Sequence, residues 1–79
     1  MNNTLHMNHQ DFVIDVLQAT RFREPDIRKG QAVFNYIDET YGVARDVQFE
    51  DGIDCFYDDS KIYDFIEKAW DRYHTSFEQ

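Results

Sequence analysis

The chain has 79 residues, of which 42% are hydrophobic and 16% aromatic, and its 16 acidic and 8 basic side chains give a formal net charge of −8. This length allows one small core and excludes an active site enclosed between domains, while the hydrophobic content excludes a chain that is disordered throughout. The acidic balance argues against general binding to nucleic-acid phosphates, which depends on Lys and Arg.

The first predicted helix spans 9–22. Asn8 is a suitable N-cap, and Asp11 places a negative charge at the positive end of the helix. Ile14 falls off the apolar stripe, so either the helix is buried broadly or Ile14 is exposed. The stripe itself consists of Phe12, Val13, Val16, Leu17 and Thr20. The polar residues 1–8 predict a disordered tail.

The second predicted helix spans 25–41, because Glu24-Pro25 marks a break and proline suits the first turn of a helix. Gly42 follows it as a left-handed cap. A glycine inside a helix costs about 1 kcal/mol relative to alanine. Gly30 therefore predicts that another segment approaches the helix backbone closely.

Arg28, Gln31 and Asn35 line one edge of this helix, since they are spaced three and four apart. They could form a binding site, or they could hold an irregular connector to the helix through hydrogen bonds. The second interpretation, a structural clamp, is favoured. Asp54 is the expected partner of Arg28, and Phe56 is expected to anchor the same segment.

The connector over 43–58 is ambiguous. A helical turn over 43–47 is favoured, and a β-hairpin over 47–56 is the alternative, although it lacks sustained alternation and an isolated hairpin is marginal. Gly52 predicts a turn with positive φ. The candidate anchors onto the core are Ile53, Phe56 and Tyr57.

The third predicted helix spans 60–74, where Asp58, Asp59 and Ser60 offer N-caps. Its apolar stripe is the clearest in the chain and contains Ile62, Phe65, Ile66, Ala69, Trp70 and Tyr73. The expected fold is all-α: a small three-helix bundle over 9–74 with a partly irregular connector between helices two and three, followed by a frayed C-terminus over 75–79.

Acidic side chains concentrate in the connector region, where Arg45 is the only base between residues 38 and 59. One interpretation is a solvated surface that keeps a small protein soluble. The other is a partner-facing surface, whose candidate residues are Asp46, Glu50, Asp51, Asp58 and Asp59.

The sequence predicts no catalytic, metal or cofactor site. His6, His9 and the distant His74 are a poor set for zinc, which needs three or four rigid ligands. The connector acids Glu50, Asp51, Asp54, Asp58 and Asp59 lack the spacing of an EF-hand. The single cysteine, Cys55, has no nearby histidine to activate it and cannot form an internal disulfide, which suits a reducing cytosol.

Two motifs resemble a family of small uncharacterised bacterial and prophage-encoded proteins. They are Arg28-x-Gly30-Gln31-Ala32-x-Phe34-Asn35 and Asp54-x-Phe56-Tyr57-Asp58, followed by Ile62 and Phe65. The resemblance implies a compact helical domain in which Arg28, Gln31, Asn35, Asp54 and Phe56 act together. It implies no activity, cofactor or catalytic residue.

The expected function is a cytoplasmic protein-interaction module of prophage or mobile-element origin, without enzymatic activity, that binds a protein with a basic surface. No apolar run approaches the roughly 20 residues that span a bilayer. The chain is expected to be a monomer or a weak dimer, with Tyr36 or Tyr63 as a possible dimer contact. One alternative is a nucleic-acid-mimicking inhibitor of a DNA- or RNA-binding enzyme, and a less favoured one is nucleic-acid binding through Arg21, Arg23, Arg28 and Lys29.

Overall fold

The computed structural model describes residues 7–22 and 24–76. Most of the expected tail over 1–8 and of the expected frayed end over 75–79 lies outside the described residues, as do His6 and Arg23. Within the described part, the chain forms four α-helices, one short 3-10 helix and no strand. The all-α prediction is confirmed.

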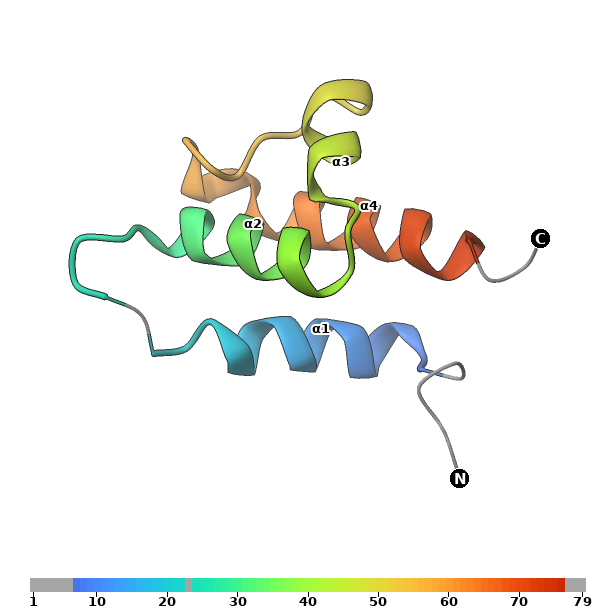
Figure 1. Cartoon of the computed structure of the whole chain (residues 1–79), viewed down its shortest axis with the longest axis horizontal. Helices are drawn as coiled ribbons and strands as arrows, with labels where there is room; N and C mark the ends of the chain where they lie inside the picture. The colour runs from blue at the N-terminus through green and yellow to red at the C-terminus, as the bar shows by residue number, and fades with distance from the viewer. Residues whose placement is uncertain (1–6, 23, 77–79) are drawn as a thin grey trace.

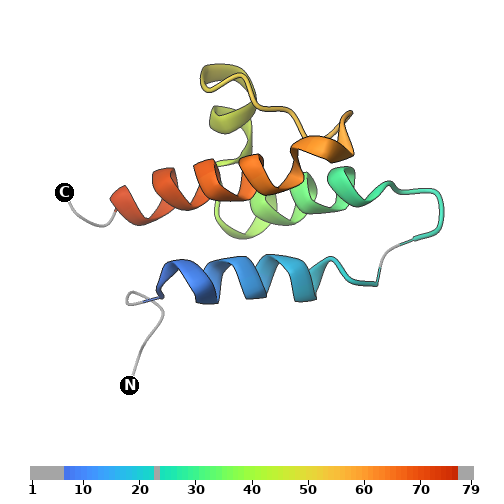
Figure 2. The same cartoon turned by 180° about the vertical axis from the view of Figure 1, so that it is seen from behind.

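The four helices are α1 (His9–Ala19), α2 (Lys29–Thr40), α3 (Ala44–Glu50) and α4 (Ile62–Thr75). α1 runs antiparallel to α2, and α4 runs parallel to α2 and packs against both (Figure 1). α3 lies across α2 and α4 on the side away from α1, as Figure 2 shows from behind. The expected three-helix bundle therefore corresponds to α1, α2 and α4, and α3 is a fourth helix within the connector.

α1 begins where its local cap predicts. Asn8 accepts a hydrogen bond from the backbone N–H of Asp11 at 2.8 Å, which confirms the N-cap. The helix ends at Ala19 rather than at residue 22, because the hydroxyl of Thr20 donates to the carbonyl of Val16 at 2.8 Å and the chain then turns. Ile14 is 43% exposed, so the α1 face outside the stripe meets solvent.

α2 begins later than predicted, at Lys29 rather than at residue 25. Pro25 lies in a turn in which the N–H of Ile27 donates to Glu24 at 3.0 Å. The start of α2 is instead capped from far along the chain, because Asp59 accepts a hydrogen bond from the N–H of Gly30 at 3.0 Å. The C-terminal cap is as predicted, with Gly42 at φ 72° and its N–H bonded to Ile37.

The connector contains more helix than predicted. α3 has two turns rather than one, because Ala44 and Val47 both reach the core and are fully buried. The alternative of a β-hairpin is excluded for this segment, which is fully described and contains no strand. Gly52 has φ 71°, as the turn prediction requires. Tyr57 is 71% exposed and is therefore not an anchor onto the core.

α4 follows a 3-10 turn over Asp59–Lys61, and Asp58 is the N-cap of that turn. Its buried side chains complete one core with those of the other helices and of the connector. The buried hydrophobic residues are Phe12, Val16, Val33, Phe34, Ile37, Ala44, Val47, Cys55, Ile62, Phe65, Ile66 and Ala69. Within the described residues, no helix combines the length and apolar character needed to cross a membrane.

Candidate partner-binding surface

Arg28 holds the connector against the start of α2. Its Nη2 donates to the carbonyl of Phe56 at 2.7 Å, and its Nε lies 3.8 Å from Asp59 Oδ1. Because Asp59 also caps the N–H of Gly30, one carboxylate joins the arginine to the helix N-terminus. The clamp is therefore centred on Arg28, Gly30 and Asp59.

The expected pairing of Arg28 with Asp54 is wrong. Asp54 Oδ1 accepts from the backbone N–H of Phe56 at 3.0 Å and from Gln48 Nε2 at 3.1 Å. The first bond closes a turn in which the aspartate side chain accepts from the backbone two residues ahead. This short-range bond uses the carboxylate that was expected to bind the distant Arg28. Asp54 therefore joins the connector to α3 rather than to α2.

Gln31 and Asn35 do not join the clamp through hydrogen bonds within the described residues. Gln31 is half-buried and Asn35 is exposed. The contact of this helix with Phe56 comes instead from Phe34, whose ring lies edge-on to the Phe56 ring at 5.3 Å between centroids. The connector is thus joined to the start of α2 by the Arg28 side chain and the Gly30 N–H, and to the next turn by the Phe34 ring.

Gly30 allows the close approach that its position in the helix predicts. A Cβ there would lie 2.0 Å from the backbone oxygen of Cys55, so no larger residue fits without a shift of the connector. The Cys55 thiol in turn lies 3.3 Å from the carbonyl oxygen of Gly30. Burial raises the pKa of the Cys55 thiol to about 12, which leaves little thiolate for nucleophilic chemistry.

The connector acids are engaged in two separate places. Arg72 of α4 donates from Nε to Asp51 at 2.8 Å and from Nη2 to Glu50 at 3.2 Å. Asp58 caps the 3-10 turn by accepting from Ser60, at the other end of the connector. Asp46 lies in the first turn of α3, the helix that ends at Glu50. Three of the five predicted surface acids are therefore bonded within the molecule, Glu50 and Asp51 to Arg72 and Asp58 to Ser60.

The pair of Arg72 and Asp51 should make stability depend on acid pH. Its hydrogen bonds hold the pKa of the Asp51 carboxyl below the usual value of 3.8. A carboxyl with a lowered pKa stabilises the fold above its unfolded-state pKa, and that stability is lost as the pH falls through the folded-state pKa. Arg72→Gln is therefore expected to lower the unfolding temperature at pH near 7, and this difference from wild type should shrink below about pH 4.

Arg45→Gln is the control for that measurement, because the Arg45 side chain is 74% exposed and its Nε lies 3.8 Å from Asp38. Such an exposed pair contributes little. Thermal unfolding of the three proteins between neutral and acid pH gives the comparison. If the unfolding temperature of Arg72→Gln stayed equally far below that of the wild type at pH values under about 4, the role of the Asp51 carboxylate would be contradicted.

Four aromatic rings and two polar side chains form a hollow between α2, α3 and the connector, here called the aromatic groove. Its volume is about 260 Å³, and it is lined by Phe34, Arg45, Gln48, Phe49, Phe56 and Tyr57. Phe49 is 77% exposed and Tyr57 is 71% exposed. α3, which supplies Arg45, Gln48 and Phe49 to the groove, lies on the side of α2 and α4 away from α1 (Figure 1).

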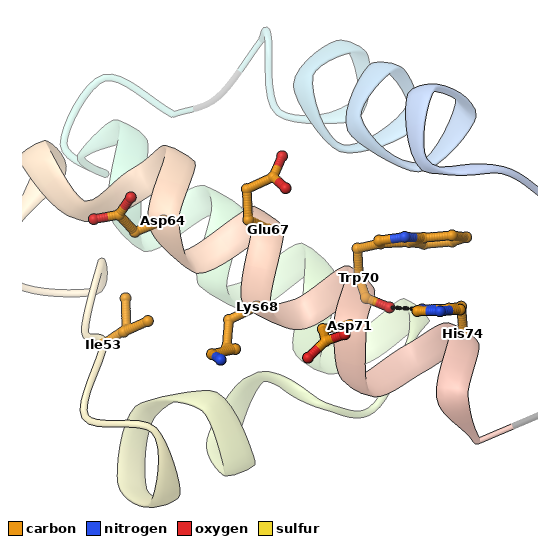
Figure 3. Close-up of a pocket in the computed structure, with 7 residues that line it drawn as sticks. All are labelled: Ile53, Asp64, Glu67, Lys68, Trp70, Asp71 and His74. Carbon is orange, nitrogen blue, oxygen red and sulfur yellow. Dashed lines mark hydrogen bonds between the residues drawn. The ribbon is translucent and has the colours of Figure 1, made fainter.

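A second hollow of about 430 Å³ runs along α4. It is lined by Ile53, Asp64, Glu67, Lys68, Trp70, Asp71 and His74 (Figure 3). The side chains diverge around the helix, with Glu67 and Trp70 toward α1 and Lys68 and Asp71 toward α3. Because these polar groups do not converge on a common point, the hollow lacks the arrangement of a catalytic site.

The two described histidines take part in contacts around α4. His9 Nε2 lies 2.6 Å from Glu67 Oε2, which joins α1 to α4. The His74 ring stacks on Trp70 at 4.7 Å between centroids. Among the described residues, no group of three or more His, Cys, Asp or Glu is placed to hold a metal ion.

No protein-family model, curated protein or solved structure matches the chain. The resemblance to small bacterial and prophage-encoded proteins stays a prediction.

Sequence reasoning placed the candidate surface on the acids and missed the aromatic groove. A signal for it is present in the register of α3. Once the helix spans 44–50, Ala44 and Val47 face the core, and Arg45, Gln48 and Phe49 share another face at spacings of three and four. An exposed phenylalanine on that face then stands out.

Proposed function

We propose that the protein is a partner-binding module, not an enzyme, and that the aromatic groove is its binding surface. The observation that supports this most directly is the pairing of Phe49 and Tyr57, which are both more than two-thirds exposed and line one hollow. Clustered exposed aromatic side chains are characteristic of interaction sites, where they supply much of the binding energy.

The groove is built on fixed contacts. Arg28 holds the carbonyl of Phe56, and Gln48 on α3 holds Asp54 of the connector. The rings of Phe56 and Tyr57 lie edge-on at 4.8 Å. A surface ordered before binding loses less conformational entropy when a partner binds, which favours affinity.

The charge of the chain favours a partner with a basic surface. A net charge of −8 attracts cationic proteins at long range and raises the association rate. The carboxylates of the region are largely engaged in caps and ion pairs with Arg28, Arg45 and Arg72. Nucleic-acid mimicry requires a continuous row of free carboxylates. The observed arrangement instead favours a surface in which aromatic rings make the contact.

Affinity capture from a lysate of the source cells tests this proposal. The baits are the wild type and the double variant Phe49→Ser/Tyr57→Ser. Proteins captured by the wild type at low salt are expected to be depleted about tenfold or more with the double variant, because truncation of aromatic hot-spot residues typically costs 2 kcal/mol or more.

The matched control is Phe22→Ser/Tyr63→Ser, which removes one phenylalanine and one tyrosine of similar exposure, 85% and 62%, outside the groove. This control should capture the same proteins as the wild type. Equal capture by both double variants would rule out the groove as the binding surface. Circular dichroism of the three baits should first show the same helical content.

A further inference from the structure

The size of the aromatic groove points to one anchoring side chain. Its volume of about 260 Å³ lies below the usual range of about 300–1,000 Å³ for small-molecule pockets. Its walls are rings from α2, α3 and the connector, with buried Phe34 at one wall and half-buried Phe56 beside it. Such a site suits a single bulky apolar side chain of a partner, inserted between rings.

The charges at the rim define what flanks that anchor. Arg45 lies 3.8 Å from Asp38, and Arg28 lies 3.8 Å from Asp59, so these two bases are offset. Asp54 and Asp58 adjoin Phe56 and Tyr57 in the chain, and within the described residues neither has an ion-pair partner within 4 Å. Lys61 and Arg28 also act on the Asp58 carboxylate. The acids beside the aromatic rings therefore exceed the bases by one charge, with Asp38, Asp54, Asp58 and Asp59 against Arg28, Arg45 and Lys61.

From these observations we infer that the groove binds a peptide segment of a partner protein in which a bulky apolar residue is flanked by Lys or Arg. The inference rests on the proposed function and specifies its partner. A second copy of this chain is disfavoured as the occupant, because two molecules of net charge −8 repel each other. The basic flanks complement Asp54 and Asp58, and the apolar anchor fills the space between the rings.

Titration of the ¹⁵N-labelled full chain with three synthetic peptides tests the inference. The first peptide carries a central leucine between lysine pairs, the second replaces that leucine with alanine, and the third replaces the lysines with glutamates. The leucine peptide is expected to shift the amide signals of α3 and of residues 56 and 57, and the alanine and glutamate peptides should bind about tenfold more weakly. Raising the salt concentration from about 50 mM to about 300 mM should also weaken the binding of the leucine peptide.

Phe49→Ser/Tyr57→Ser should reduce leucine-peptide binding about tenfold, and Phe22→Ser/Tyr63→Ser should leave it unchanged. Equal affinity for the leucine and alanine peptides would overturn the inference by showing charge attraction alone. The inference would also be overturned if the leucine peptide did not bind, or if it shifted amide signals outside the groove. It would be overturned as well if the groove signals shifted with increasing protein concentration in the absence of peptide, because that would indicate that a second copy of the chain occupies the groove. If the peptides fail while lysate capture still depends on Phe49 and Tyr57, the proposed function stands and the partner chemistry is wrong.

Discussion

Gly30→Ala is expected to destabilise the protein by about 3 kcal/mol or more, although alanine stabilises an ordinary helix interior by about 1 kcal/mol relative to glycine. The new Cβ would lie 2.0 Å from the Cys55 backbone oxygen and 2.8 Å from Asp59 Oδ1. The Asp59 side chain can rotate away, but the Cys55 carbonyl moves only if the connector moves. Since a chain of this length has a total stability of about 4–12 kcal/mol, much of it would be lost, as urea denaturation followed by circular dichroism can measure.

Two control variants separate the causes of that loss. Gly52→Ala introduces a Cβ at φ 71° with no atom within 4 Å, so it should cost only the backbone penalty of about 1–2 kcal/mol. Asp59→Ala removes the cap of α2 without a clash and should cost about 1 kcal/mol. If Gly30→Ala proved as stable as wild type, the close approach of Cys55 would have to be abandoned as the reason for this glycine.

The same contact explains how the first turn of α2 supports the aromatic groove. The connector passes over Gly30 at Cys55, and Arg28 donates a hydrogen bond to the carbonyl of the next residue, Phe56. Phe56 and Tyr57 follow immediately and form part of the aromatic groove. A shift of the connector at Cys55 would therefore displace the rings that are proposed to receive a partner.

Elements with local signals could be predicted from the sequence. Asn8 caps α1 through a residue three positions ahead, and Gly42 ends α2 through its own φ, so both signals lie within a few residues. Gly30 was informative because a glycine inside a predicted helix costs stability relative to alanine. Its physical reason, close approach of another segment, could be inferred before the segment was known.

Elements defined by distant contacts could not be placed from the sequence. α2 begins at Lys29 because Asp59, 29 residues beyond Gly30, caps it, and the local proline signal indicated an earlier start. The partner of Arg28 depended on how the connector crosses α2, which helix spacing alone does not determine. The groove was missed for the same reason, since three separate segments supply its rings and no single stretch shows the pattern.

Phe12→Ala is expected to cost about 3–5 kcal/mol, the second large effect, because Phe12 is fully buried where α1 meets α2 and α4. Its ring lies 4.6 Å from Tyr41, 5.5 Å from Trp70 and 5.9 Å from Tyr73, measured between centroids. Aromatic pairs of this kind contribute beyond the area they bury. Removal of the ring would leave a cavity between these three aromatic neighbours.

The contacts of α1 with α2 also include a polar set one turn from Phe12. The hydroxyls of Tyr36 and Tyr41 both donate to Asp15, the former at 2.7 Å. Burial and these bonds raise the pKa of both tyrosines, so they remain donors through the neutral range. This polar set joins α1 to the C-terminal part of α2 and the residue that follows it, and its expected net contribution is smaller than that of the buried ring.

Urea denaturation with Trp70 fluorescence measures the Phe12→Ala effect, since that indole lies beside the deleted ring. Ile14→Ala is the control on the same helix, because Ile14 is 43% exposed, and it should change stability by no more than about 0.5 kcal/mol. In native buffer, Phe12→Ala should also shift Trp70 emission to longer wavelength, because the half-buried indole loses the ring that covers part of it. Equal stability of the two variants would mean that α1 is held to the rest of the molecule by contacts other than the Phe12 cluster.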